Sequence, residues 1–128
     1  FVEKYNWATS VTNFGQAGYF SMLKYAKVMV GNSSSGIIES ASFQIPVVNV
    51  GDRQQGRVKS FNVIDVEYNK NKIIKAINKA LSPSFNNKLK GMKNPYGNGK
   101  ASKKIINSIN KIANNKKLII KKFYNMDS

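Results

Sequence analysis

Three consecutive hydroxyl side chains, Ser33–Ser35, stand between a short apolar run and a stretch whose apolar residues have helical spacing. Serine is unfavourable inside helices, but at the start of a helix it presents hydroxyls beside unpaired backbone N–H groups. A helix start also carries the positive end of the helix dipole, which attracts anions. Gly36 follows and leaves room for close approach, and the Glu39 carboxylate comes one turn later. These residues are suited to a phosphate and, through Glu39, to a ribose diol.

A second group of residues that could take part in chemistry is the segment 51–57, GDRQQGR. It contains both arginines of the chain, Arg53 and Arg57. Either guanidinium could stabilise the negative charge on a departing phosphate, and Asp52 could orient one of them. Each feature alone has a plainer explanation, since serines before a helix usually act as caps and a lone glutamate is usually solvated. Their combination predicts a nucleotide or sugar-nucleotide phosphate site.

Both groups follow stretches that are typical of buried parallel strands, residues 27–31 (KVMVG) and 46–51 (PVVNVG). Segments 7–11 (WATSV) and 62–66 (NVIDV) are further strand candidates. Ligands of doubly wound sheets bind just beyond the carboxyl ends of the strands, which is where the serines and arginines are expected.

Apolar residues with helical spacing occupy the stretches between and after these strands. The segments are 19–26, 37–42, 73–81 and 105–112. We expect Ile45–Pro46 to interrupt the second of them and Ser82–Pro83 to stop the third. The alternation of strands and helices predicts an α/β fold, a parallel sheet with helices on its faces.

The composition excludes several classes of chemistry. The chain has 128 residues, 41% of them hydrophobic, which suits one domain with a hydrophobic core. It contains no cysteine and no histidine, so disulfides, thiolate metal sites and Ser-His-Asp or Cys-His catalysis within the chain are excluded. We expect neither a metal nor a cofactor. No stretch reaches the roughly 18 apolar residues of a membrane span, and residues 1–10 do not resemble a signal peptide, so we expect a cytoplasmic protein.

The net charge of +15 has two interpretations. One is a polyanionic partner, which would make the chain a basic nucleic-acid-binding module. The other is a compositional bias, because all 21 basic residues except Arg53 and Arg57 are lysines, whereas nucleic-acid readers rely on arginine. The nucleic-acid alternative offers no explanation for the serines or Glu39, so we expect no nucleic-acid partner. The basic, amphipathic tail 116–128 is expected to pack as a terminal helix rather than bind a membrane.

The segment 30–57 closely resembles the C-terminal half of UDP-N-acetylglucosamine 2-epimerases of the hydrolysing kind. The matching residues are Gly31-Asn32-Ser33-Ser34, Gly36, Glu39, Pro46, Asn49, Gly51, Arg53-Gln54 and Gly56-Arg57. Segments 14–26 and 94–99 also resemble the family, so the resemblance spans nearly the whole chain. Nonhydrolysing relatives carry a Ser-Gly-Gly turn instead, and Asn-Ser-Ser-Ser-Gly therefore favours the hydrolysing branch.

The resemblance implies two Rossmann-like domains that face each other across a cleft, as in B-type (GT-B) glycosyltransferases. Residues 1–128 would form a single, partial UDP-binding domain, most of the C-terminal one, with C-terminal helices from about residue 98 onward. The UDP-binding residues it implies are Ser33, Ser34, Ser35, Gly36, Glu39 and Arg53. Among them, the serines would bind the diphosphate, Glu39 the ribose hydroxyls, and Arg53 the departing diphosphate as the catalytic residue.

The reaction implied by the resemblance is elimination of UDP across C1 and C2 of the sugar, followed by addition of water to the resulting glycal. The products would be UDP and a 2-epimeric N-acetylhexosamine for the synthesis of sialic, legionaminic or related acids. The acid and base groups would come from the other domain, so we expect this chain alone to be inactive and the full-length protein to be a homodimer. A glycosyltransferase with the same UDP-binding domain is the alternative enzyme.

Overall fold

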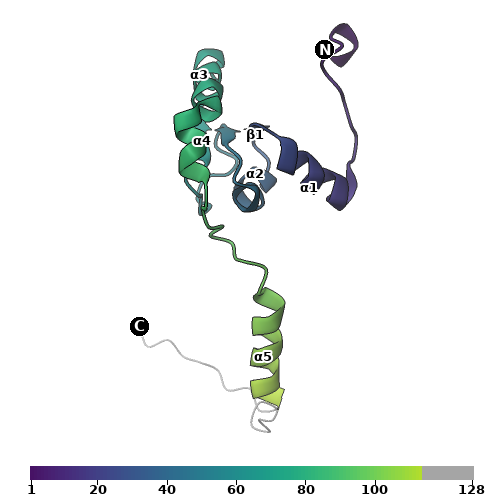
Figure 1. The fold of residues 1–128 in the computed structure, drawn as a ribbon, viewed down its shortest axis with the longest axis vertical. Helices are drawn as coiled ribbons and strands as arrows, with labels where there is room; N and C mark the ends of the chain where they lie inside the picture. The colour runs from purple at the N-terminus through teal and green to yellow at the C-terminus, as the bar shows by residue number, and fades with distance from the viewer. Residues whose placement is uncertain (114–128) are drawn as a thin grey trace, which may run out of the picture. The chain divides into compact units, whose positions relative to one another are not determined.

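The computed structural model describes residues 1–113 of the chain, which divides into two units, Phe1–Tyr96 and Gly97–Ser128. The first unit contains a three-stranded sheet in the order β1-β2-β3, in which both neighbouring pairs are parallel (Figure 1). The strands are β1 Met29–Gly31, β2 Val47–Val50 and β3 Val63–Val66. The predicted α/β fold class, a Rossmann-like parallel sheet with helices, is confirmed.

Three of the segments expected to be helical, 19–26, 37–42 and 73–81, overlap helices of the first unit, which also contains helices that the apolar spacing does not predict. The helices of this unit are α1 Gly15–Tyr25, α2 Ser35–Ile38, α3 Lys70–Leu81 and α4 Pro83–Leu89, with short 3-10 helices η1 Val2–Lys4 and η2 Ser40–Phe43. The helix expected at 37–42 is divided between α2 and η2. It ends at Gln44, which adopts the left-handed conformation with φ 56° just before Pro46 begins the approach to β2.

Helices cover both faces of the sheet, and the alternation of side chains along β2 shows how. Val47 and Val48 point to opposite faces because neighbouring residues of a strand do. Gly36 of α2 packs against Val47, whereas Ala76 and Ala80 of α3 pack with Val48 in the buried core. Figure 1 shows α3 and α4 on one side of the sheet and α1 and α2 on the other. β2 is therefore apolar at both positions, as a strand buried on both faces must be.

The strand predicted at 7–11 is wrong. These residues lie outside every strand of the described sheet, and Trp7 is 71% exposed. Its indole instead packs against the rings of Phe1 and Tyr5, with centroid separations of 5.4 and 5.3 Å. β-Favouring side chains do not form a strand unless another strand pairs with their backbone.

The helix α4 does not follow from the spacing of apolar residues in the sequence. Ser82–Pro83 ends α3 as expected, but Ser82 is at the same time the N-cap of α4, where its hydroxyl accepts a hydrogen bond from the Phe85 N–H at 3.3 Å. Proline is favoured in the first turn of a helix because its missing N–H would have no partner there. The same pair of residues therefore stops one helix and starts the next.

In the second unit, the described residues form α5, Ala101–Ala113. The isoleucines that predict it, Ile105, Ile106, Ile109 and Ile112, are each more than half exposed. The tail 116–128 lies outside the described residues. Among residues 1–113, no helix has the length and apolarity needed to cross a membrane. The organisation of residues 1–128 as a single domain stays a prediction.

Candidate functional site

The two groups of chemically interesting residues lie at the same edge of the sheet. β1 ends at Gly31, and residues 32–34 lead from it into α2. β2 ends at Val50, and residues 51–57 follow it. Because β1 and β2 are parallel neighbours with Gly31 paired to Asn49, their carboxyl ends meet, as predicted.

A single backbone oxygen joins the two groups. The carbonyl of Asn32, just before the serines, accepts hydrogen bonds from the Arg53 guanidinium at 3.1 Å and from the Gln54 amide at 2.8 Å. Arg53 is exposed, whereas Gln54 is only 2% exposed. The structure thus brings the predicted catalytic arginine beside the predicted phosphate turn.

The serines are not fully explained by capping. The Ser33 hydroxyl accepts a hydrogen bond from the Ser35 N–H at 3.3 Å, which stabilises the turn locally. Ser34 precedes α2 in the N-cap position, yet its side chain makes no capping hydrogen bond. The Ser35 hydroxyl is buried and has no hydrogen-bond partner among the described residues. Capping therefore does not account for the hydroxyls of Ser34 and Ser35.

Gly36 has a packing function that the sequence alone does not indicate. A methyl group at this position would lie 3.0 Å from Cγ1 of Val47 and 3.5 Å from the sulfur of Met29. The absent side chain therefore faces the sheet and allows α2 to approach it closely. A contribution of Gly36 to UDP binding stays a prediction.

Glu39, at the end of α2, has a buried carboxylate oxygen, Oε2, without a hydrogen-bond partner among the described residues. Burial and, to a smaller extent, the negative charge of Glu39 raise the pKa of the Tyr19 phenol on α1. A buried carboxylate oxygen without a partner costs free energy. Hydroxyl donors from a ligand, such as those of a ribose, would remove this cost.

Asn94, part of the loop that resembles the family, anchors this loop to the end of α2 and to η2. Its amide donates to the carbonyl of Ile38 at 2.7 Å and to the hydroxyl of Ser42 at 2.8 Å. Two residues later, the Tyr96 hydroxyl donates to the carbonyl of Val58 at 2.9 Å. This loop therefore connects the end of α2 with the segment that follows Arg57.

A buried network of polar side chains stabilises the position of α2. The Ser40 hydroxyl donates to the carbonyl of Gly36 at 2.6 Å. The amide of Asn62 donates to the Ser40 hydroxyl at 2.9 Å and to the carbonyl of Ile45 at 2.7 Å. Buried hydrogen bonds of this kind fix the position of the helix, because breaking one leaves a desolvated polar group unpaired.

Comparison with known proteins identifies the family. The family model described as UDP-N-acetylglucosamine 2-epimerase matches residues 1–110. The chain belongs to this family. Every residue of the candidate site lies within the matched range, which includes the two strand-end turns and the loop around Asn94.

Individual relatives agree with this assignment to the epimerase family. The polysialic acid biosynthesis protein P7 of Escherichia coli is 37% identical over 108 residues, 84% of this chain and 28% of the relative. The UDP-N,N'-diacetylbacillosamine 2-epimerase (hydrolyzing) of Legionella pneumophila is 46% identical over 86 residues, 67% of this chain and 22% of the relative. The GDP/UDP-N,N'-diacetylbacillosamine 2-epimerase (hydrolyzing) of Campylobacter jejuni is 54% identical over 57 residues, 44% of this chain and 15% of the relative. The chain thus spans less than a third of each of these proteins.

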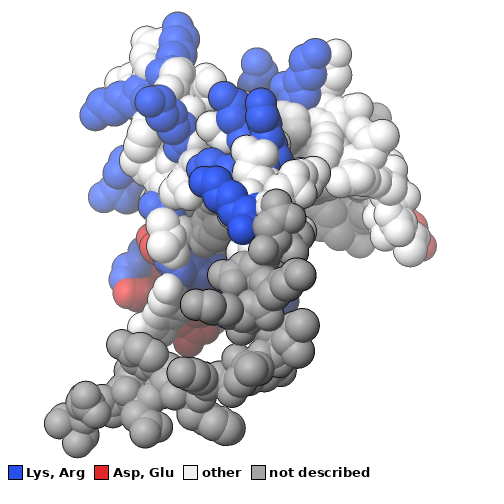
Figure 2. Space-filling model, turned by 90° about the horizontal axis from the view of Figure 1, so that it is seen from below, with Lys and Arg blue, Asp and Glu red and all other residues white. Residues whose placement is uncertain are grey.

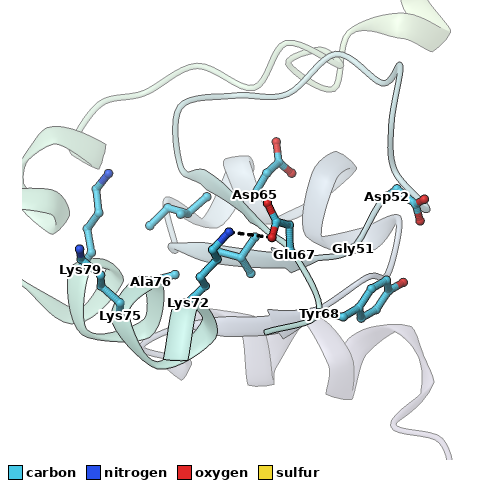
Figure 3. A pocket seen from close by; sticks show the side chains of 11 residues that line it. Gly51, Asp52, Asp65, Glu67, Tyr68, Lys72, Lys75, Ala76 and Lys79 are labelled. Atoms are coloured by element: carbon cyan, nitrogen blue, oxygen red, sulfur yellow. Dashed lines mark hydrogen bonds and ion pairs between the residues drawn. The ribbon is translucent and has the colours of Figure 1, made fainter. Parts of the chain in front are cut away.

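A cavity of about 760 Å³ in this epimerase-family chain lies between β3 and α3 rather than at the serines (Figure 3). Figure 3 shows Lys72, Lys75 and Lys79 along α3 at its rim, where Lys72 pairs with Glu67 at 2.7 Å. None of Ser33–Ser35 lines it. The lining does include Gly51 and Asp52, the first two residues of the segment that carries Arg53.

The surface of the epimerase-family chain is strongly basic, and Figure 2 shows one face on which lysine and arginine side chains outnumber acidic ones. One acidic residue, Asp65, belongs to β3. Its carboxylate forms an ion pair with Lys59 at 2.9 Å and accepts a hydrogen bond from the Asn49 amide at 2.7 Å. Burial would raise the pKa of Asp65, but these hydrogen bonds and the Lys59 charge outweigh it and lower the pKa. In residues 1–113, no three His, Cys, Asp or Glu side chains cluster as a metal site would require.

Proposed function

We propose that this chain is the UDP-binding portion of a hydrolysing UDP-sugar 2-epimerase with a GT-B-type two-domain fold. The observation that carries the proposal is the shared Asn32 carbonyl, which holds Arg53 beside the serine turn in a chain of this family. A positive charge beside the turn would stabilise a phosphate bound there, which supports the proposal. The family match supports an epimerase over the alternative glycosyltransferase.

In this proposal, the turn residues Ser33–Ser35 and Gly36 bind the diphosphate, and Glu39 binds the ribose hydroxyls. Arg53 is the catalytic residue of the chain. A guanidinium has five N–H donors, so one of them can remain on Asn32 while others contact the departing diphosphate. Stabilising the charge that develops on a leaving group is among the largest contributions to enzymatic rate.

The reaction proceeds in two steps that conserve oxidation state. A base removes the C2 proton as the C1–O bond breaks, which releases UDP and leaves a glycal; water then adds at C1 and a proton at C2 from the opposite face. Neither step needs a redox cofactor. The chain contains no histidine, and the acid and base groups are proposed to come from the rest of the full-length protein.

The sugar is an acetamido sugar, since relatives are named for UDP-N,N'-diacetylbacillosamine and for UDP-N-acetylglucosamine. The test is to incubate the full-length protein with each UDP-sugar in D2O and follow the products by NMR. We expect free UDP together with a 2-epimeric sugar that carries deuterium at C2. Retention of the C2 proton, or transfer of the sugar to an acceptor, would contradict the proposal.

The chain alone is proposed to be inactive, because the groups that move protons are not in it. Purified residues 1–128 should release no UDP from either substrate under conditions in which the full-length protein does. We further propose that the full-length protein is a cytoplasmic homodimer without a nucleic-acid partner. Light scattering of the purified protein and a salt titration of its binding to random duplex DNA test the last two points.

A further inference from the structure

We infer that Gln54 is a positioning residue for the diphosphate, because it sets the orientation of the peptide between Asn32 and Ser33. The inference rests on the proposed function, which places the diphosphate at this turn. The experiment below distinguishes a failure of this inference from a failure of the proposed function. Gln54 follows the catalytic Arg53 directly but has very different surroundings.

The amide of Gln54 has one productive orientation. Its Nε2 donates to the Asn32 carbonyl at 2.8 Å, and its Oε1 is buried without a partner among the described residues. The reverse orientation would place two acceptor oxygens against each other. The side chain is only 2% exposed, so it has little space in which to move away from the carbonyl.

The contact controls the direction of a neighbouring N–H group. Every peptide bond in the described chain is trans, and in a planar trans peptide the C=O and the following N–H point in opposite directions. When Gln54 holds the Asn32 oxygen toward β2, the Ser33 N–H points to the other side. Within residues 1–113, the Ser33 and Ser34 N–H groups donate to no backbone or side-chain acceptor. They are therefore available to an anion.

Gln54, rather than Arg53, is the residue suited to this task. Arg53 is exposed, and its guanidinium is needed at the leaving group. If Gln54 is removed, the Asn32 carbonyl keeps only the Arg53 donor. The turn then loses its buried anchor, and only the exposed Arg53 side chain still holds the Asn32 carbonyl. Loss of Gln54 should thus weaken contacts to phosphate but not contacts to the nucleoside.

The experiment compares Gln54→Met with Gln55→Met in the full-length protein. Methionine has nearly the shape of glutamine but no donor, and Gln55 is exposed with no side-chain hydrogen bond in the described structure, so the control makes the same chemical change without the contact. Calorimetry measures the affinity for UDP and for uridine, and thermal unfolding measures stability. We expect UDP binding to weaken at least tenfold in Gln54→Met only, with uridine affinity unchanged in both variants.

A second variant, Gln54→Asn, keeps an uncharged amide but shortens the side chain by one methylene, which draws the donor away from the Asn32 carbonyl, and it should also weaken UDP binding. If Gln54→Met does not fold, this variant decides the question. Equal UDP affinity in the Gln54 variants and the control would overturn the inference, as would equal losses for UDP and uridine. Absence of UDP binding by the unmodified protein would instead overturn the proposed function.

Discussion

The Arg53 guanidinium lies 3.1 Å from the carbonyl oxygen of Asn32, although 21 residues separate the two in sequence. The contact joins the turn after β1 to the turn after β2. It fixes the position of a positive charge relative to three serines. Several consequences for binding and turnover follow from it.

Arg53→Lys should reduce turnover of the full-length protein more than UDP affinity. Lysine keeps the charge but lacks the planar fork, so it cannot contact the carbonyl and a phosphate through separate rigid donors. We expect kcat to fall about tenfold to hundredfold, which corresponds to about 1.4–2.7 kcal/mol of transition-state stabilisation. Steady-state kinetics and calorimetry measure the two effects. Arg57→Lys is the control, and equal losses in kcat and UDP affinity would speak against a role in the transition state.

The double substitution Ser33→Ala and Ser34→Ala should weaken UDP binding by about 1–3 kcal/mol, the range for hydrogen bonds to a charged group. Ser10, which is exposed and makes no hydrogen bond in the described structure, provides the control as Ser10→Ala. Calorimetry and thermal unfolding together decide the outcome. A lower melting temperature with unchanged UDP affinity would show that the serines only stabilise the helix start.

Asp65 should make the stability of the protein depend on pH in the acid range. Its folded pKa is lowered, so its contribution to stability is present above the unfolded pKa of about 3.9 and is lost as the pH falls through the folded pKa. Asp65→Asn should therefore lower the melting temperature modestly at pH 7, because the carboxylate is half-exposed. The difference from the unmodified protein should disappear near pH 2. The matched control is Asp52→Asn, at an exposed carboxylate without an ion pair in the described structure.

Asn94→Ala should destabilise the loop around residue 94. It removes three hydrogen bonds, to the Ile38 carbonyl, to the Ser42 hydroxyl and from the Tyr96 N–H, each worth about 0.5–1.5 kcal/mol net. The melting temperature should fall, and Asn87→Ala at an exposed position of α4 should leave it the same or slightly higher, since alanine favours helix. Equal melting temperatures in the two variants would exclude an anchoring role for Asn94.

The sequence predicts the central strands well, because burial on both faces produces a continuous apolar run. Residues 46–51 contain β2, Val47–Val50, for this reason. The segment 7–11 has the same kind of residues but no strand beside it, and pairing between strands is a property of the whole fold rather than of a segment. Pro83 shows a different difficulty, since one residue type can either end a helix or begin one.

The site shows a similar division between local and tertiary information. That the serines and Arg53 meet follows from two strand ends in a parallel sheet. That Gln54 is buried and contacts Asn32 does not follow, because two adjacent glutamines, Gln54 and Gln55, have opposite environments. The contact between Asn94 and Ile38 spans 56 residues, and no local spacing indicates it.

The close approach of Gly36 to β2 has a consequence for how the site meets its ligand. A methyl group added at Gly36 would already contact Val47, so α2 cannot move closer to the sheet. The hydrogen bonds of Ser40 also hold α2 in place. The amides of the turn are therefore preorganised when the chain folds, and an arriving anion has little backbone motion left to freeze. The proposed recognition of a phosphate at this turn would therefore use a backbone shape that is present before the ligand binds.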